Sequence, residues 1–352
     1  MSLHDLLVAQ IAAHGPMRIS DFMADCLLHP EFGYYTTQQP FGESGDFITA
    51  PEISQMFGEL IGLSLAQSWL DQGSPDPFSL VEFGPGRGTL MADILRATKG
   101  IAGFHDAANV VLIEASAKLC EQQSLTLAGF APEWIDSIDD LAPLPTFAVA
   151  NEFFDALPIR QFVRDGNGWR ERQVGVVDGV LTFGLGPNMP QPALGHRLED
   201  TKDGDLVEEC ASATAIITSL GQRINDCGGT ALIIDYGDWR SLGNTLQALK
   251  DHAPVDPLSS AGQADLTAHV DFEALATAAP CPFSRITPQG VFLERLGITQ
   301  RAQTLAQNME ADTLDAHILA HKRLTHPDEM GNLFKVMGLY AENGRPPAGL
   351  EP

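Results

Sequence analysis

The chain has 352 residues, and its 21 Lys and Arg residues against 46 Asp and Glu residues give a formal net charge of −25. This charge argues against a nucleic-acid backbone or an anionic membrane surface as the main partner, because both attract positive charge. Hydrophobic residues make up 44% of the chain, which is enough for a normal core and excludes disorder throughout. The acidic residues fit a solvated surface better than a field that attracts a basic partner, and both interpretations stay open.

The sequence shows no segment for membrane insertion or export. No apolar run reaches the roughly 18 residues of a membrane-spanning helix, and the N-terminus has neither a signal-peptide nor a transit-peptide pattern. The five cysteines are scattered without a CxxC pair, which indicates reduced thiols, and no His, Cys and Asp spacing indicates a metal site. We therefore expect a cytoplasmic protein that uses no metal and makes no stable membrane insertion; its oligomeric state stays open.

Residues 1–75 are expected to form a helical extension before the main domain. Near the N-terminus, Leu3, Leu7 and Ile11 recur at helical spacing. Pro51, followed by an acidic residue, predicts the start of a later helix that runs to Trp69, before a proline-rich break.

Strand and helix patterns alternate from residue 76 onward. Short apolar strands are predicted at 80–83, 110–113, 134–135, 147–150 and 231–235, and helices at 89–98 and 115–123. This alternation predicts an α/β fold in which helices cover both faces of a parallel sheet.

An insertion at about 158–226 interrupts this alternation. Asp165-Gly166-Asn167-Gly168 and Asp178-Gly179 are hairpin turn signals, which predict antiparallel strands, and a long helix is expected at 205–226. Later segments predict helices at 271–279 and 299–324 and a last strand at 333–337. We thus expect one domain over residues 76–352, with antiparallel β and helical insertions.

The strongest local motif is the strand at 80–83, which carries Glu82 and runs into Gly84, Gly86 and Gly88 before a helix. Glycines allow a tight turn and a close approach of the backbone to a ligand at the carboxyl end of a strand, where such sheets bind nucleotides. The spacing G-x-G-x-G differs from the G-x-G-x-x-G of dinucleotide enzymes, and no Lys-Ser/Thr pair follows for a triphosphate. The motif therefore favours a ligand without a pyrophosphate.

Two acidic residues complete this candidate site. Glu114 follows the next strand, where a carboxylate can accept both hydroxyls of a ribose; the alternative is an acid that favours the start of a helix. Glu82 either holds the ammonium of an amino-acid moiety or is a buried, hydrogen-bonded acid. A cofactor with a ribose and an α-amino group but no phosphate is S-adenosylmethionine (SAM), so the motif indicates a class I methyltransferase.

Asn151, Glu152 and Asp155 follow the predicted strand at 147–150 and are the candidate catalytic residues. In this topology they face the transferred methyl group across the crevice. On a helical turn Glu152 and Asp155 would share one side, and two neighbouring carboxylates suit a guanidinium group, which is a planar fork of donors. The alternative is a helix N-terminus with Asn151 as its cap.

Several segments together resemble the MidA-like family, which includes a mitochondrial complex I assembly-factor arginine methyltransferase. They lie at residues 33–59, 81–90, 150–162, 232–237, 264–272, 287–298 and 330–337. The first and third segments are far more specific than the glycine motif. The resemblance implies a Rossmann-like class I methyltransferase sheet with an N-terminal helical extension, SAM as cofactor and, for the mitochondrial member, dimethylation of an arginine in a complex I subunit.

Carried over residue by residue, the resemblance implies three groups of site residues. The cofactor site would comprise Gly84, Gly86, Gly88 and Glu114; its cover would include Thr49, Pro51 and Ile53; and the transferred methyl group would be flanked by Asn151 and Glu152. The missing transit peptide favours a bacterial cytoplasmic protein. Two other functions stay open: a non-catalytic SAM-binding assembly chaperone for a basic protein partner, and a nicotinamide oxidoreductase, which rests on the glycine motif alone.

Overall fold

The computed structural model describes residues 2–37, 49–307 and 309–352, and the chain divides into two compact units. The larger unit consists of residues 48–154, 214–239 and 270–352, and the smaller unit of residues 1–47, 155–213 and 240–269. This division differs from the predicted boundary at residue 75, because the helix before that boundary packs into the core of the larger unit.

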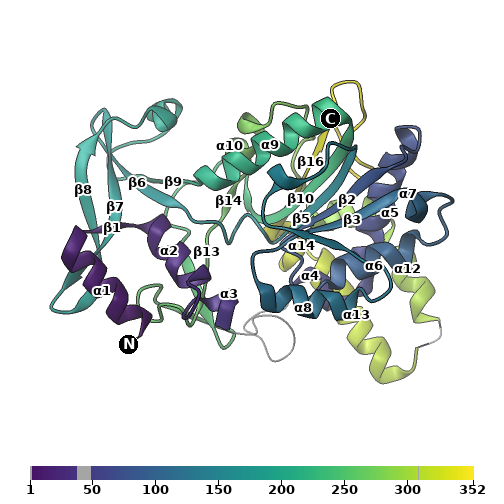
Figure 1. The fold of residues 1–352 in the computed structure, drawn as a ribbon, viewed down its shortest axis with the longest axis horizontal. Coiled ribbons are helices and arrows are strands. Elements are labelled where there is room, and N and C mark those ends of the chain that lie inside the picture. Colours follow the sequence, from purple (N-terminus) through teal and green to yellow (C-terminus); the bar gives the residue numbers. More distant parts are fainter. Residues whose placement is uncertain (1, 38–48, 308) are drawn as a thin grey trace. The chain divides into compact units, whose positions relative to one another are not determined.

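A mixed sheet forms the centre of the larger unit (Figure 1). Its strands are β2 (Phe78–Phe83), β3 (Ala108–Ile113), β4 (Glu133–Ile135), β5 (Thr146–Asn151), β10 (Gly229–Asp238), β14 (Val270–Asp271), β15 (Thr287–Pro288) and β16 (Phe334–Tyr340). Within the described residues this eight-stranded sheet has the order β15-β16-β10-β5-β2-β3-β4, with β14 beside β10. β2 pairs in parallel with β3 and β5, and β5 with β10, while β16 runs antiparallel to β10. The predicted α/β fold is confirmed, but the sheet is mixed where a parallel sheet was predicted, because β15 and β16 at one edge pair antiparallel.

Helices cover both faces of this sheet. They are α4 (Ala50–Ile53), α5 (Gln55–Asp71), α6 (Thr89–Thr98), α7 (Phe104–Ala107), α8 (Ala117–Thr126), α9 (Ala211–Cys227), α10 (Phe272–Ala278), α11 (Gln289–Arg295), α12 (Ile298–Ala306), α13 (Ala311–Thr325) and α14 (Met330–Leu333). α5 and α6 lie on one face and α9 and α10 on the other (Figure 1). Alternate strand residues such as Leu80, Leu112 and Val149 share one core with α5 and α6, because successive side chains of a strand point to opposite faces. Across the described residues, every helix is too short or too polar to cross a membrane.

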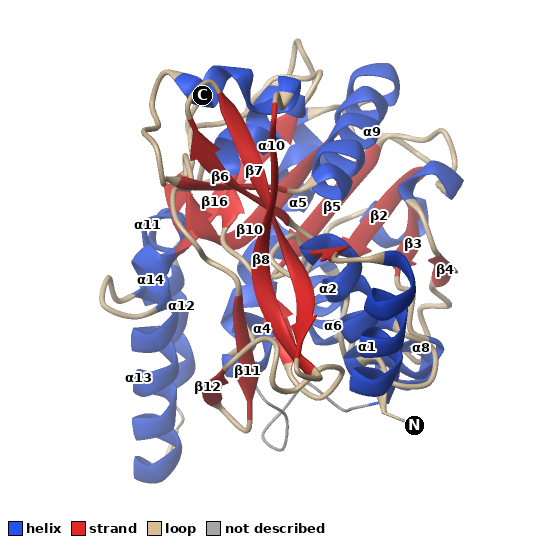
Figure 2. Ribbon diagram, turned by 90° about the vertical axis from the view of Figure 1, so that its left-hand side faces the viewer, coloured by secondary structure: helices blue, strands red, loops and turns tan. Residues whose placement is uncertain are grey.

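The smaller unit combines antiparallel strands with short helices (Figure 2). Its elements are α1 (Leu3–His14), β1 (Met17–Arg18), α2 (Ile19–Leu28), α3 (Tyr34–Thr37), β6 (Arg160–Asp165), β7 (Gly168–Val177), β8 (Val180–Met189), β9 (Leu206–Glu209), β11 (Gln247–Lys250), β12 (Ala253–Val255) and β13 (Asp265–Thr267). Among the described residues, β1-β7-β6-β9 with β8 beside β7 form one sheet, and β12-β11-β13 a second. Both predicted hairpins are present, because Asp165 pairs with Gly168 and Val177 with Val180.

Three predicted helices have different bounds in the structure. The helix expected from Pro51 to Trp69 is interrupted at Ser54, which is extended and caps α5 with its side chain, so α4 and α5 are separate. The helix predicted at 205–226 starts only at α9, because the residues of β9 pair with β6 in the smaller unit. The helix predicted at 299–324 is two helices, α12 and α13, which pack against each other.

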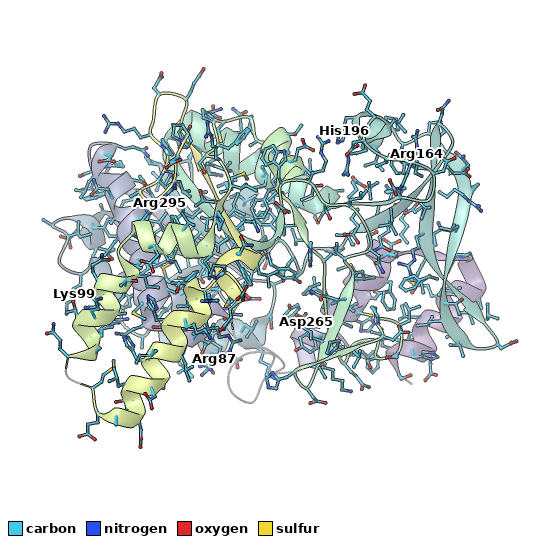
Figure 3. The ribbon with its side chains drawn as sticks, turned by 180° about the vertical axis from the view of Figure 1, so that it is seen from behind. Arg87, Lys99, Arg164, His196, Asp265 and Arg295 are labelled. Carbon is cyan, nitrogen blue, oxygen red and sulfur yellow. The ribbon has the colours of Figure 1, made fainter. Side chains whose placement is uncertain are left out.

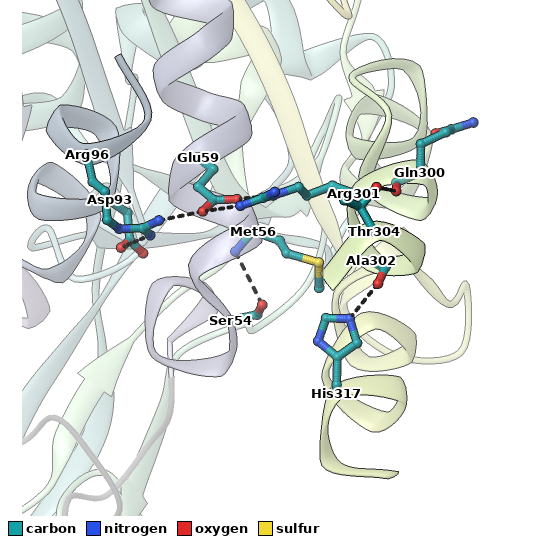
Figure 4. Close-up of polar contacts among 10 residues, drawn as sticks. All are labelled: Ser54, Met56, Glu59, Asp93, Arg96, Gln300, Arg301, Ala302, Thr304 and His317. Atoms are coloured by element: carbon teal, nitrogen blue, oxygen red, sulfur yellow. Dashed lines mark hydrogen bonds and ion pairs between the residues drawn. The ribbon is translucent and has the colours of Figure 1, made fainter. Parts of the chain in front are cut away.

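A buried ion network joins three helices of the larger unit (Figure 4). Glu59 of α5 is 5% exposed, and its carboxylate accepts from Arg96 of α6 at 2.6 Å and from Arg301 of α12 at 2.7 and 3.0 Å. Burial alone would raise the pKa of Glu59, but the two guanidinium groups outweigh it and hold the pKa below its usual value. The network therefore attaches α12, and with it α13, to the helices that cover the sheet.

Candidate active site

The glycine turn between β2 and α6 brings the backbone to the carboxyl edge of the sheet. Gly84, Gly86 and Gly88 have φ angles of 58°, 51° and 81°, a region that residues with side chains rarely adopt. A Cβ atom on Gly84 would lie 2.8 Å from Cδ2 of Phe153. Glycine is therefore required at Gly84 on two grounds, backbone conformation and space.

Glu82 lies one residue before the end of β2 and is 3% exposed. Its Oε2 atom is buried and has no hydrogen-bond partner among the described residues. Burial raises the pKa of Glu82 to about 8, and the negative charge of Glu114 adds to the increase. A buried carboxyl with an unpaired oxygen is costly in isolation, so this position favours a ligand that brings a cation or a donor.

Glu114 directly follows β3, at the strand next to β2. Its Oε1 atom accepts from the N–H of Ser116 at 2.8 Å and its Oε2 atom from Nε2 of Gln123 at 3.1 Å. Burial raises the pKa of Glu114 and these hydrogen bonds oppose the increase. The carboxylate is thus held in one orientation while each oxygen retains a lone pair for a hydroxyl group.

Gln123 of α8 is a residue of this site that the sequence analysis missed. It is fully buried, and its Nε2 atom also donates to the carbonyl oxygen of Gly86 at 2.8 Å. Its Oε1 atom accepts from Nε1 of Trp134 at 2.8 Å. One amide therefore connects Glu114 to the glycine turn. A sequence signal existed, because Gln123 lies four residues after Leu119 and four before Leu127, on the apolar side of the helix.

Asn151 and Glu152 lie where β5 ends, at the same edge of the sheet. The Oε1 atom of Glu152 accepts from the N–H of Ala50 at 3.0 Å and from Nδ2 of Asn151 at 3.1 Å. Glu152 is half-buried and its φ angle is 51°, a strained value for a residue with a side chain. Burial raises the pKa of Glu152 to about 7; the two hydrogen bonds and the positive charge of Arg323 oppose the increase.

The helical turn on which Glu152 and Asp155 would share one side does not form. No helix occupies residues 152–158: Glu152 leaves the strand in the left-handed region, and Pro158 disfavours a helical conformation just before it. The alternative in which Asn151 caps a helix is excluded for the same reason. Asp155 belongs to the smaller unit, where it is 7% exposed and its carbonyl oxygen accepts from the N–H of Ala268 at 2.9 Å.

Asp235 is a second site residue that the sequence analysis did not single out. It lies in β10, next to β5, and is fully buried. Its Oδ2 atom accepts from the N–H groups of Phe153 at 3.2 Å and Phe154 at 2.9 Å. Asp235 therefore holds the backbone that follows Glu152, and this contact between strands distant in sequence explains the unusual backbone there.

The short helix α4 carries the predicted cofactor cover, and part of the segment resembling the MidA-like family lies outside the described residues, at 38–48. Thr49 precedes α4, Pro51 lies in its first turn and Ile53 ends it. Glu52 accepts from Thr89 Oγ1 at 2.6 Å and pairs with Arg87, labelled in Figure 3, at 3.3 Å. α4 thus contacts the start of α6 through Glu52 and, through the N–H of Ala50, the carboxylate of Glu152. The structure brings the cover, the glycine turn and Glu152 together.

Comparison with known proteins agrees with this geometry. A family model described as "Putative S-adenosyl-L-methionine-dependent methyltransferase" matches residues 60–284. "Protein arginine methyltransferase NDUFAF7, mitochondrial" from Xenopus laevis is 36% identical over 363 residues, covering 95% of this chain and 83% of the relative. The Homo sapiens protein of the same name is 35% identical, covering 95% of this chain and 82% of the relative.

A solved structure extends the agreement to three dimensions. A Burkholderia thailandensis protein bound to S-adenosyl-homocysteine matches with a TM-score of 0.84 and 29% identity, covering 99% of this chain and 94% of that chain. A native crystal structure of a protein from the same organism matches with a TM-score of 0.81 and 28% identity, covering 99% of this chain and 93% of that chain. The chain therefore belongs to this family of S-adenosyl-L-methionine-dependent methyltransferases.

Proposed function

We propose that this protein transfers the methyl group of SAM to an arginine side chain of a protein. Relatives at about 35% identity are named protein arginine methyltransferases, which supports the acceptor class. The observation that carries the proposal is the carboxylate of Glu152, fixed by two hydrogen bonds on a strained backbone at the edge of the cofactor-binding sheet.

The residues around the glycine turn fit SAM. The unpaired Oε2 atom of Glu82 suits the ammonium group of its amino-acid moiety, and the oriented carboxylate of Glu114 suits its ribose hydroxyls. Gly84, Gly86 and Gly88 let the backbone approach the ligand, and Thr49, Pro51 and Ile53 cover it. When bound, SAM supplies an electrophilic methyl group on a sulfonium. The protein's own contribution is to exclude water and position the acceptor nitrogen in line with that methyl group.

Glu152 is assigned the role of orienting the acceptor and taking its proton. A guanidinium is protonated at neutral pH, with a pKa above about 12, and its nitrogen becomes a nucleophile only as its charge is localised and the proton leaves. A carboxylate beside it serves both purposes. Asn151 and the N–H of Ala50 keep Glu152 in place, and Asp155 is retained as the predicted supporting residue.

The test compares Glu152→Gln with the wild type in two assays. The variant keeps the shape of the side chain and should bind S-adenosyl-homocysteine normally in calorimetry. It should lose at least about a hundredfold in transfer of labelled methyl from SAM to proteins of an extract from a strain lacking the gene. Transfer at the wild-type rate would show that Glu152 is not the catalytic carboxylate.

The same assay separates catalysis from the chaperone alternative. A non-catalytic SAM-binding assembly chaperone would bind S-adenosyl-homocysteine and a basic protein, yet label no protein in that extract.

We propose a bacterial cytoplasmic location, with a respiratory complex I subunit as acceptor. Fractionation of cells for the protein, and labelling of purified complex I from the deletion strain, test these two points separately.

A further inference from the structure

A wide-open cavity of about 520 Å³ lies at the surface of the larger unit, between the end of α13 and α14. Its walls come from one stretch of chain and include Arg323, Asp328, Glu329, Met330 and Leu333. Met330 is buried and Leu333 is 51% exposed, so the walls combine an apolar surface with charged groups. α13 packs against α14, and both are labelled in Figure 2.

The strand register places this cavity at the edge of the sheet where Glu152 lies. Asn151, the last residue of β5, is paired with Ile234 of β10, and Ile234 is paired with Val336 of β16. Because β16 runs antiparallel to β10, the chain enters β16 at the carboxyl edge of β10. α14 ends just before this entry, so the cavity beside α14 lies near the edge that carries the candidate catalytic carboxylate.

Arg323 connects the cavity with that carboxylate. Arg323 is one of the residues that line the cavity, and its positive charge lowers the pKa of Glu152. α13 also packs against α4, whose Ala50 N–H donates to Glu152. The other groups that face Glu152 are Asn151 on β5 and, one strand further, Asp235 on β10, whose carboxylate is taken up by backbone N–H groups.

Among the described residues, the side chain of Arg323 forms no ion pair or hydrogen bond, although two acids line the same cavity. Those acids are near other cations: Glu329 lies 3.8 Å from Nζ of Lys322, and Asp328 lies 3.7 Å from Nδ1 of His326. The cavity therefore presents an exposed guanidinium with its donors unused, next to an apolar wall. A guanidinium fork of this kind matches a carboxylate.

We propose that this cavity binds the segment of the acceptor protein that flanks the methylated residue, and that Arg323 recognises a carboxylate side chain on that segment. The proposal rests on the proposed function, since it needs a protein acceptor. It makes Arg323 a specificity-determining residue: an acidic side chain bound to Arg323 places the neighbouring acceptor side chain near Glu152, while an apolar side chain contacts Leu333.

The experiment measures binding without catalysis. Fluorescein-labelled short peptides with a central arginine carry Asp, Asn or Lys at one flanking position at a time, and fluorescence anisotropy follows their binding to the full-length protein with S-adenosyl-homocysteine. At one or two positions the wild type should bind the Asp peptide about tenfold more tightly than the Asn peptide. Arg323→Gln should remove this difference, and Arg323→Glu should reverse it in favour of Lys.

Lys99→Gln is the control, because it removes a positive charge from an exposed position outside the cavity wall. It should keep the preference for Asp. Equal binding of Asp and Asn peptides, no peptide binding at all, or a preference that survives Arg323→Glu overturns the proposal. Transfer of labelled methyl from SAM to the same peptides is measured separately. A preference for Asp that depends on Arg323, with no label on arginine, counts against the proposed function. Label on arginine without a preference for Asp counts against this site alone.

Discussion

Replacing Glu82 with Gln tests the cofactor site through two opposite effects. Burial raises the pKa of Glu82 to about 8 in the folded protein, against the ordinary value of 4.5. Between these pH values the unfolded chain has already released a proton that the folded protein retains, so stability falls as the pH rises and stays low above pH 8. The difference between the two pKa values corresponds to a loss of at most about 5 kcal/mol in the free energy of unfolding.

Glu82→Gln removes the loss of stability that comes from ionising a buried carboxyl group. It also removes the proposed partner of the SAM ammonium group. At pH 8.5 and without cofactor, the variant should therefore unfold at a temperature a few degrees above that of the wild type, corresponding to about 2 kcal/mol, and the advantage should shrink towards pH 5. Calorimetry should show at least about tenfold weaker binding of S-adenosyl-homocysteine. Glu121→Gln, an exposed position on α8, should change neither property. A variant that is less stable than the wild type at pH 8.5, or that binds the ligand equally well, would refute the reasoning.

The glycine turn, Gln123 and Glu152 can each be tested by one measurement. Gly84→Ala places a Cβ atom 2.8 Å from the Phe153 ring at a φ angle of 58°. Calorimetry should therefore show at least about tenfold weaker binding of S-adenosyl-homocysteine. The control variant Gly100→Ala has open space around the added Cβ atom and should bind the ligand normally. Gln123→Leu leaves the indole N–H of Trp134 and one oxygen of Glu114 without their buried partner, so urea unfolding should show a loss of about 2–4 kcal/mol; a loss below about 0.5 kcal/mol would contradict the connecting role. The carboxylate of Glu152, with a pKa of about 7, must be ionised to accept a proton, so kcat/KM should rise about tenfold between pH 6 and pH 8, and a flat profile would exclude this role.

The centre of the sheet could be predicted from sequence because its inner strands β2, β5 and β10 are buried almost throughout. Such strands appear as short continuous apolar runs bounded by turn residues, and the strand predicted at 80–83 forms the end of β2, which is buried throughout. The glycine turn was predictable for a related reason, since glycines at alternate positions after a buried strand have few other uses. The hairpin turn was predictable from the Asp178-Gly179 pair. Two-residue hairpin turns favour Asp-Gly because both positions need positive φ angles, and both residues have them.

The remaining features depend on contacts between segments that are far apart in sequence. The backbone after Glu152 is held by Asp235, more than eighty residues later. The helical turn on which the acids at 152 and 155 would share one side therefore does not form. Similarly, the residues of β9 have a pattern compatible with a helix, and only their pairing with β6 makes them a strand. Local propensity is overridden in each case by tertiary contacts that the sequence does not display.

The identity of the methylated atom tests the central claim most directly. Extract from a strain lacking the gene is incubated with the purified protein and SAM carrying a deuterated methyl group, and tandem mass spectrometry locates the label. We expect deuterated methyl on arginine side-chain nitrogens of a protein, present with the wild type and absent with Glu152→Gln. Label on another residue type or only on small molecules, or equal arginine labelling by the variant, would contradict it.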